Sequence, residues 1–412
     1  MKILVISDFD NLPLQISHSL KDLGEVQFLT TRNLEDSLST NISGFNDKLT
    51  WYKNAIRSFI FRNIILKVNN RYSYYQDINE NSNYYSAKKI IQKLKFVPDI
   101  IIILFDYRLL TTKTIKDLYE WSNAKIYWMI PDMKPMTGGC SYAAKCSEYE
   151  RSCSSCPAIS NYFMKNFAHK TLRKKINNLQ KVSIDIITGS TMQYQQAKNS
   201  SLFRSKNIHK IYFPSSEKFF KFKNKDEARQ QLNLITNKKV ILLGATSLTE
   251  ERKGVKFALS ALENLSTKDK ENTLLLLIGN GDMEKLNKLE IEYKNLGFVD
   301  YEKLALSYQS ADLFICPTID DSGPVMVSQS ILCGTPVVAF KMGISIDFIE
   351  NNKTGYICDL ENFQQLSFGI SQIVNASNEQ YESMQKNCLE RSHQLNFINF
   401  KEKLTKLLND AG

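Results

Sequence analysis

The chain has 412 residues, a hydrophobic content of 43% and a formal net charge of +10 at pH 7, with a sequence pI of about 9.0. This length is too great for one hydrophobic core, so two domains are predicted. The basic balance favours anionic partners such as nucleotide diphosphates or anionic lipids. No basic region with heptads and no aromatic RNA-binding motif points to a nucleic-acid partner.

The N-terminal stretch lacks the features of an export signal. Met1 leads directly into a strand, with no basic segment, long apolar segment or cleavage site. No run approaches the roughly 18 apolar residues of a membrane-spanning helix. A cytoplasmic protein is expected, and a peripheral position on the inner face of the plasma membrane is a further hypothesis.

The first part of the chain alternates between buried strands and helices. Strands are expected at 2–7, 100–105 and 125–130, and this alternation predicts a doubly wound parallel sheet. Asp8 and Asp10 follow the first strand at its carboxyl end. They are candidates for contacts with acceptor hydroxyl groups, and an ordinary polar loop is the competing interpretation.

Two segments of this part are basic and helical in pattern. Residues 51–68 carry apolar residues at helical intervals among lysines and arginines, which is typical of a helix that lies on an anionic membrane. A helix packed on its own domain is the alternative. Residues 165–181 form a second basic helix, read either as a solvated face or as a contact for a membrane or an acceptor phosphate.

A cluster of four cysteines follows the strand at 125–130. Cys140, Cys146, Cys153 and Cys156 have the spacing C-x5-C-x6-C-x2-C. In a cytoplasmic chain such a cluster favours a metal over disulfides, and thiolates at this spacing can close a tetrahedral zinc site. Reduced thiols without a metal, and a redox or iron–sulfur role, remain alternatives.

The second domain is predicted to begin with a strand at 239–243, followed by Gly244 and Ala245. A glycine after a strand lets the backbone approach a phosphate. Arg252 and Lys253 stand near the start of the next helix and supply positive charge for a phosphate. A solvated helix N-terminus is the alternative. No G-x-G-x-x-G follows the first strand of either domain, which argues against a nicotinamide dehydrogenase.

A strand, a loop, a helix and another strand are predicted between Leu313 and Phe340. In such a unit the loop and the helix N-terminus lie at the carboxyl edge of a parallel sheet, where ligands bind. Asp321 lies in the loop, and Gln329 lies eight residues later in the helix. The loop and the helix start also contain four candidate donor contacts: Ser322, Gly323, Pro324 and Val325.

Four short motifs carry a family resemblance: 137–142 (TGGCSY), 153–157 (CSSCP), 333–339 (CGTPVVA) and 352–357 (NKTGYI). With them the chain resembles the retaining glycosyltransferases of family four, in particular the polysaccharide-cluster branch similar to colanic acid biosynthesis transferases. The resemblance implies an α/β GT-B fold, with two Rossmann-like doubly wound domains that face a central cleft.

The resemblance also implies a division of labour along the chain. Residues 1–218 would form the acceptor-binding domain and residues 219–385 the nucleotide-sugar domain, and residues 386–412 would be a helix that crosses back to the first domain. Arg252 and Lys253 would clamp the donor diphosphate. The remaining implied contacts are the donor sugar at Asp321, the ribose at Gln329, the base beside the strand of Phe298, and the acceptor at Asp132.

The chain departs from the family pattern at several of these positions. The family has E-x7-E where this chain has Asp321 and Gln329, and a glutamine in place of the second glutamate implies ribose binding weaker by roughly 1–3 kcal/mol. Pro131 stands in place of a histidine. Ala245 stands in place of an arginine, so Arg252 would have to supply that charge.

These features predict a retaining glycosyltransferase of cell-surface polysaccharide synthesis, such as that of lipopolysaccharide or capsule. The donor would be a nucleotide diphosphate sugar, with UDP- or GDP-sugars favoured, and the acceptor a glycan or a polyprenyl-linked glycan. No catalytic metal is expected, because Arg252 and Lys253 would neutralise the diphosphate. The alternative is a non-catalytic GT-B-like subunit or glycan-binding partner with a degenerate donor site. The cysteine cluster disfavours an epimerase of GT-B shape.

Overall fold

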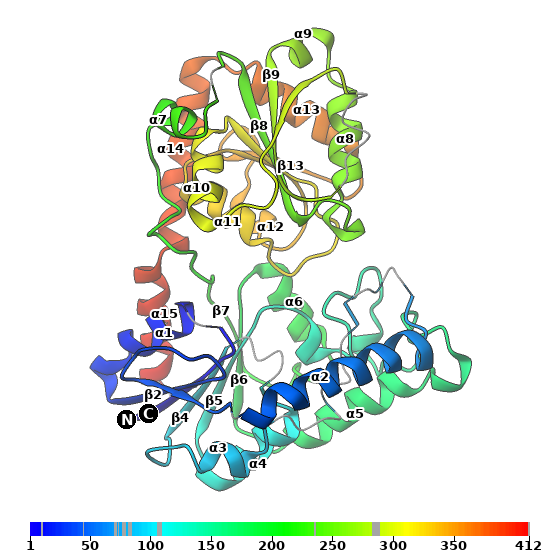
Figure 1. Ribbon diagram of the computed structural model, residues 1–412, viewed down its shortest axis with the longest axis vertical. Coiled ribbons are helices and arrows are strands. Elements are labelled where there is room, and N and C mark those ends of the chain that lie inside the picture. The colour runs from blue at the N-terminus through cyan, green and yellow to red at the C-terminus, as the bar shows by residue number, and fades with distance from the viewer. Residues whose placement is uncertain are drawn as a thin grey trace. The chain divides into compact units, whose positions relative to one another are not determined.

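The computed structural model describes residues 1–9, 11–43, 45–69, 72, 74–75, 80, 85–104, 109–234, 236–281 and 289–410 (Figure 1), with the backbone alone for 45–51 and 54. The chain divides into two compact units. The first contains Met1–Gly189, Gln193–Ile211 and Thr405–Gly412, and the second contains Ser190–Met192 and Tyr212–Leu404. The main chain passes to the second unit after Ile211, somewhat before the predicted boundary at 218, and returns after Leu404.

The first unit is built on a seven-stranded parallel sheet with the order β3-β2-β1-β4-β5-β6-β7. Nearly every residue of the central strands is buried, as expected for a parallel sheet covered on both faces. The strands are β1 (Lys2–Ile6), β2 (Glu25–Thr30), β3 (Ser39–Asn41), β4 (Ile100–Leu104), β5 (Lys125–Ile130), β6 (Ile184–Thr188) and β7 (Ile208–Lys210).

Helices connect these strands. Most of the short 3-10 segments lie in the long connection after β5. The helices are α1 (Asn11–Ser19), α2 (Phe45–Ile60), the π-helical continuation η2 (Phe61–Ile65), α3 (Ala87–Ile91), α4 (Thr112–Ser122), α5 (Phe167–Leu179) and α6 (Thr191–Asn199). The 3-10 segments include η1 (Lys21–Leu23), η5 (Lys134–Met136), η6 (Glu148–Glu150) and η7 (Tyr162–Met164).

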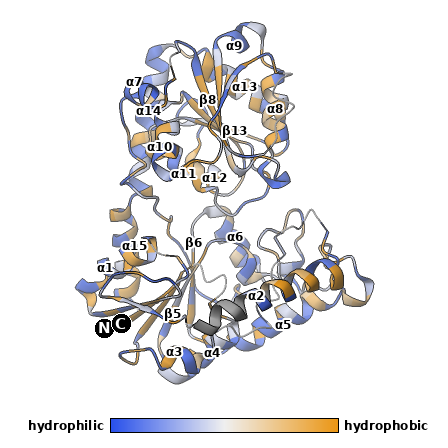
Figure 2. Ribbon diagram, viewed as in Figure 1, coloured by the Kyte–Doolittle hydropathy of each residue, from blue (hydrophilic) through white to orange (hydrophobic). Residues whose placement is uncertain are grey.

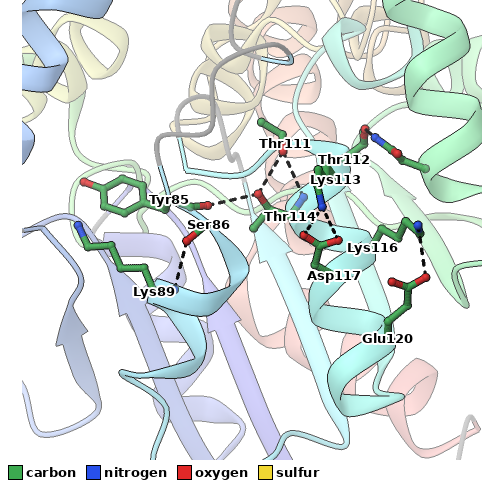
Figure 3. Close-up of polar contacts among 11 residues, drawn as sticks. Tyr85, Ser86, Lys89, Thr111, Thr112, Lys113, Thr114, Lys116, Asp117 and Glu120 are labelled. Atoms are coloured by element: carbon green, nitrogen blue, oxygen red, sulfur yellow. Dashed lines mark hydrogen bonds and ion pairs between the residues drawn. The ribbon is translucent and has the colours of Figure 1, made fainter.

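The N-terminus of α4 illustrates how side chains fix these helices (Figure 3). Thr111 is the N-cap, and its hydroxyl accepts a hydrogen bond from the backbone N–H of Thr114 at 3.1 Å. The Thr114 hydroxyl donates to the Tyr85 carbonyl at 3.2 Å, which ties α4 to the segment before α3. The buried carboxylate of Glu80 accepts from the backbone N–H of Thr112 at 3.1 Å, as a negative charge does favourably at a helix start.

The second unit contains a six-stranded parallel sheet with the order β10-β9-β8-β11-β12-β13. The strands are β8 (Lys239–Ser247), β9 (Thr273–Asn280), β10 (Glu292–Asn295), β11 (Leu313–Cys316), β12 (Val337–Phe340) and β13 (Gly355–Cys358). The order changes direction between β8 and β11. In sheets of this type that point opens a crevice at the carboxyl ends of the strands.

Helices cover both faces of this second sheet, and two hydrophobic clusters lie between them and the strands. The helical segments of this part of the chain are α7 (Lys225–Gln231), η8 (Glu251–Lys253), α8 (Val255–Glu263), α9 (Thr267–Glu271), α10 (Tyr301–Ser310), α11 (Val325–Leu332), α12 (Ser345–Phe348), α13 (Phe363–Val374), α14 (Asn378–Ser392), η10 (His393–Leu395) and α15 (Phe397–Asn409), and the last residues of α15, from Thr405, belong to the first unit. Within the described ranges, no helix combines the length and the apolar character needed to cross a bilayer.

The structure corrects three predicted elements. The strand expected around Phe298 lies earlier, at β10, and residues 296–299 follow it. The strand expected at 239–243 continues to Ser247, because β9 is long enough to pair with it beyond a bulge. The helix expected over residues 386–412 is interrupted at η10 and resumes as α15. The predicted strand end at Phe105 lies outside the described residues.

Candidate functional site

The candidate site of the second unit lies at the point where the strand order changes direction. The chain leaves β8 and forms η8, which contains Arg252 and Lys253. The chain leaves β11 and forms the loop 317–324, which contains Asp321. These two connections follow neighbouring strands, so they meet at one edge of the sheet.

Asp321 joins the two connections through ion pairs. One carboxylate oxygen of Asp321 lies 2.8 Å from an Arg252 guanidinium nitrogen and 2.9 Å from the Lys253 ammonium nitrogen. Its other oxygen accepts from the backbone N–H of Gly323 at 3.2 Å. Residues 68 and 69 positions apart in the chain therefore form one polar cluster.

Further contacts hold Arg252 in place. Its guanidinium also forms an ion pair with Glu250 and donates to the Asp320 carbonyl at 3.3 Å. The Arg252 carbonyl accepts from the backbone N–H of Ile319 at 2.9 Å, which links η8 directly to the opposite loop. The guanidinium thus has little freedom, and a ligand would meet an oriented charge.

Asp321 is ionised in this environment. Burial disfavours the charged carboxylate, but Lys253 and Arg252 together hold the pKa of Asp321 below its usual value. The cluster therefore contains two cations and two carboxylates, those of Asp321 and Glu250. An incoming diphosphate would replace part of this internal neutralisation.

Gly254 sets the turn that presents Lys253. Its φ is +65°, in the left-handed region that favours glycine. A Cβ at this position would lie 1.9 Å from the Pro317 carbonyl oxygen, so the close approach of η8 to the loop after β11 requires a glycine here.

Gly244 and Ala245 lie inside β8 and not after it, which corrects their predicted position in a phosphate loop. Gly244 pairs with Ile278 of β9, and a Cβ on Gly244 would lie 2.3 Å from the Ile278 side chain. Ala245 is buried. The glycine is therefore needed for packing between neighbouring strands.

The loop after β11 ends at the N-terminus of α11. Pro324 is the N-cap, and among the described residues no side chain caps this helix start. Gly323 has open space where a Cβ would be, and Val325 is exposed. The Ser322 hydroxyl is buried, and it has no hydrogen-bond partner within the described part of the chain. Such a helix N-terminus can accept a phosphate group.

Gln329 has a different environment from the one predicted for a ribose contact. Its side chain is buried, and its amide oxygen accepts a hydrogen bond from the Tyr308 hydroxyl at 3.2 Å. Tyr308 is itself fully buried between α11 and the strands. Phe298, by contrast, is largely exposed after β10.

The first-unit candidates serve local structure. Asp132 is buried, and its carboxylate accepts from the backbone N–H of Lys134 at 2.8 Å, which stabilises the turn after β5. The Asp8 carboxylate accepts from the Thr31 hydroxyl at 2.8 Å. Asp10 lies outside the described residues. The predicted acceptor contacts at Asp8 and Asp132 therefore stay predictions.

The cysteine cluster lines one small cavity of the first unit. Within the described part of the chain none of the four cysteines forms a disulfide, and Cys153 and Cys156 are buried. Together with Cys140 and Cys146 they border a cavity of about 20 Å³, which is enough for roughly one water molecule or ion. Burial raises the pKa of Cys153 to about 12, so without a cation the thiol stays neutral. In the described ranges, no three His, Cys, Asp or Glu side chains are arranged to hold a metal ion.

Lys175 corrects the interpretation of residues 165–181 as an entirely solvated basic face. Lys175 is buried, and its ammonium donates to the carbonyls of Lys134 and Thr137 at 2.8 Å each. It thus anchors the loop before the cysteine cluster to α5. Lys175 lies two residues from the exposed Arg173 and Asn177, and helical spacing alone does not reveal that this loop covers it.

Arg252, Lys253, Asp321 and Gln329, with their partners Glu250 and Tyr308, are called the donor-side cluster below. The two partners were not predicted. Glu250 neutralises Arg252, and Tyr308 binds Gln329. The charge pattern E-E-R-K at 250–253 is a weak signal for Glu250. Nothing in the sequence pairs Tyr308 with Gln329, because the two lie on different helices, 21 residues apart.

Comparison with known proteins bears on this same unit. Residues 224–391 match the family model described as "Glycosyl transferases group 1". The matched residues lie in the second unit and make up less than half of the chain, and they include the whole donor-side cluster, from Glu250 to Gln329.

A curated relative and solved structures extend the likeness. An uncharacterized glycosyltransferase of Methanocaldococcus jannaschii is 24% identical over 154 residues, which cover 36% of this chain and 38% of the relative. The chain thus matches well under half the length of that relative. Sucrose-phosphate synthase from Thermosynechococcus elongatus has a similar fold, with a TM-score of 0.67 and 16% identity over 100% of this chain and 98% of the other.

A second solved structure, the Anabaena protein HepE in complex with UDP-glucose, aligns over 100% of both chains with a TM-score of 0.61 and 14% identity. These likenesses establish the fold. Two Rossmann-like units with parallel sheets match the GT-B glycosyltransferase structures, and the predicted fold class is confirmed.

Proposed function

We propose that the chain transfers a sugar from a nucleotide diphosphate sugar to a glycan or lipid-linked acceptor, with retention of the anomeric configuration. The observation that supports this most is the meeting of Arg252 and Lys253 with Asp321 at the crevice between β8 and β11. The match to group 1 glycosyltransferases covers these residues.

The two cations fit the chemistry of sugar transfer. As the bond between the sugar and the diphosphate breaks, negative charge grows on the leaving diphosphate. Fixed cations that meet this charge lower the barrier, because their interaction is stronger in the transition state than with the bound donor. Arg252 is already oriented by Glu250 and Asp320. Lys253 supplies a second charge from the same turn.

We propose a UDP- or GDP-sugar as the donor. Its diphosphate would lie between η8 and the N-terminus of α11, where the uncapped helix end and the Ser322 hydroxyl offer hydrogen bonds. HepE, which has a similar fold, binds UDP-glucose. The role in cell-surface polysaccharide synthesis rests on the resemblance of the TGGC and CxxCP motifs to the polysaccharide branch.

Nucleotide binding tests the donor site. Calorimetric titration of UDP, GDP, dTDP, ADP and CMP, and of their common sugars, should give micromolar affinity for one nucleotide. Lys253→Ala should weaken that affinity about tenfold or more, because a charged hydrogen bond is lost. Lys256→Ala is the matched control, since Lys256 is exposed one turn later, on α8.

A non-catalytic subunit is the second candidate function. Its specific support is Gln329, whose amide is turned toward Tyr308 and is uncharged where the family has a glutamate. Failure of folded protein to bind any of these nucleotides would reject the enzyme and favour this candidate. Tight binding that is insensitive to Lys253→Ala would reject the proposed diphosphate site.

We further propose that the four clustered cysteines bind one structural zinc ion. The shared cavity supports this, and the present arrangement of the side chains requires the thiols to turn toward one another on binding. Metal analysis should find about one zinc per chain. Cys153→Ser should remove the zinc and lower the melting temperature, whereas Cys388→Ser, at a buried thiol of the other unit, should leave the zinc in place. Zinc-free wild-type protein of full stability would contradict the proposal.

A further inference from the structure

The first unit carries an apolar stripe on the outer face of α2 and η2. Its members recur at helical spacing, so they share one face. Each is between 61% and 66% exposed: Tyr52, Ile56, Phe59 and Ile64. Figure 2 shows apolar ribbon along the described part of α2. Large apolar side chains at this exposure are an unfavourable surface unless something covers them.

The opposite face of the same helical segment anchors it to the first unit. The Phe61 ring packs against Phe167 of α5 with centroids 5.1 Å apart, and Leu66 is fully buried. The helical segment is therefore anchored through side chains other than Ile56, Phe59 and Ile64. The sequence alternatives, a helix packed on its domain and a helix on a membrane, are both compatible with this two-faced segment.

A second exposed element adjoins the end of the stripe. In η7, Tyr162 is 81% exposed and Phe163 is 91% exposed. The preceding residue, Asn161, donates from its side chain to the Ile65 carbonyl at 2.7 Å and from its backbone to the Leu66 carbonyl at 3.2 Å. The two rings thus stand beside the end of η2. The outer apolar patch consists of Tyr52, Ile56, Phe59, Ile64, Tyr162 and Phe163.

Positive charge surrounds this patch. Neither the stretch 48–76 nor the stretch 151–184 contains an aspartate or a glutamate. Lys53 and Arg57 are exposed next to the stripe, and Lys67 is exposed at its end. All formally charged side chains of these two stretches are lysines and arginines, and a patch of aromatic and branched apolar side chains next to such cations is complementary to an anionic lipid surface.

We propose that the outer apolar patch binds the surface of an anionic lipid bilayer, with the rings and branched side chains among the acyl chains and the cations at the headgroups. A second copy of the chain fits less well, because two such patches would bring like charges together. Within the described ranges no helix can span a bilayer, so binding would be in the plane of the surface. Membrane binding through this patch does not require that the chain transfers a sugar.

Co-sedimentation of the full chain with vesicles tests this. We expect binding to vesicles of equal parts phosphatidylcholine and phosphatidylglycerol that is about tenfold or more tighter than binding to phosphatidylcholine alone, and that weakens with salt. Phe59→Ser with Ile64→Ser should weaken binding about tenfold or more, because apolar area is lost. Lys53→Glu with Arg57→Glu should weaken it similarly, and only on the anionic vesicles.

Matched controls lie in the second unit. Phe368 and Ile398 are 60% and 64% exposed, and their replacement by serine should leave vesicle binding unchanged. The same holds for Lys268→Glu with Lys386→Glu, which changes the net charge equally. Circular dichroism melts confirm folding of each variant, and nucleotide titration reports separately on the donor site.

Three results would overturn the proposal. The first is wild-type protein that sediments with neither vesicle type. The second is an equal loss of vesicle binding in the patch variants and in the control variants, because the effect would then be general. A dimer in solution that Phe59→Ser with Ile64→Ser abolishes, without vesicle binding, would assign the patch to a second copy of the chain.

Discussion

Asp321 has two opposing effects on the donor-side cluster. Its carboxylate orients Arg252 and Lys253 in the absence of a ligand, which favours a site that needs little rearrangement on binding. The same carboxylate competes with a diphosphate for those cations. The net effect on nucleotide affinity is the balance of orientation and competition, and one substitution can separate the two.

Asp321→Asn should bind the free nucleotide diphosphate at least as tightly as the wild type, because an anionic competitor is removed. Sugar transfer should fall by about a hundredfold or more if Asp321 also contacts the donor sugar, as the family resemblance implies. Calorimetry and initial-rate measurements on the same preparation check both effects. Weaker nucleotide binding together with unchanged turnover would refute this assignment.

Asp321→Asn should also change how the stability of the protein falls at acid pH. The pKa of Asp321 is lowered on folding, so its contribution to stability is fully present above the unfolded-state pKa of about 3.9 and is lost as the pH falls through the folded-state value. Urea unfolding between about pH 7 and pH 3 should therefore show a shallower acid decline for Asp321→Asn. Parallel curves for the two proteins would show that the ion pairs do not contribute.

At the scale of elements, the short connection η8 decides where the cations lie. It is a single 3-10 turn, and its position depends on the bond from Ile319 to Arg252 and on the close contact of Gly254 with Pro317. The contacts of this turn with the loop after β11 fix its position. A change in its backbone should therefore affect the donor-side cluster as well as stability.

Gly254→Ala tests this dependence. The left-handed conformation costs alanine about 1–2 kcal/mol, and the clash with the Pro317 oxygen adds to that cost and displaces η8. Gly297→Ala is the matched control, since Gly297 has a similar φ of +66° with no described atom within 4 Å of its Cβ position. Thermal unfolding should show the larger loss for Gly254→Ala, and nucleotide affinity should fall in that variant. Equal losses of thermal stability in the two variants would mean that the contact with Pro317 is unimportant.

At the scale of the whole molecule, the chain passes to the second unit after Ile211 and returns to the first unit after Leu404. The last turns of α15 belong to the first unit, where the Leu407 carbonyl accepts from the Tyr127 hydroxyl at 3.4 Å. Leu408 is fully buried. The stability of the first unit therefore depends on residues that follow the second unit in sequence.

Leu408→Ala should destabilise the first unit by about 2–5 kcal/mol, because it leaves a cavity in a buried site. Calorimetric unfolding with and without the bound nucleotide distinguishes the units, since the ligand should raise the transition of the second unit. The substitution should lower the temperature of the transition that does not respond to the nucleotide. Below that temperature, nucleotide affinity should be unchanged. A loss confined to the nucleotide-sensitive transition would place Leu408 with the second unit.

The strongly periodic elements were determined by the sequence itself. Runs such as Ile100–Leu104 and Leu313–Cys316 are apolar throughout, because a strand in a covered parallel sheet buries both faces, and their alternation with helices predicted a doubly wound parallel sheet. Arg252 and Lys253 could be singled out as cations at a helix start after a strand, and Asp321 through its loop at the carboxyl end of a strand together with the family resemblance, whereas their mutual contact is a finding of the structure.

Other features depended on contacts between distant segments. Gly244 lies inside β8 because β9 is long enough to pair with it, and Gln329 faces Tyr308 because two helices place them together. Lys175 is buried because a loop covers it, although its helix reads as a basic surface. Local sequence sets periodicity and turn chemistry, whereas burial and partner choice are set by what packs against each residue. Only the tertiary structure could therefore decide the environment of these three residues.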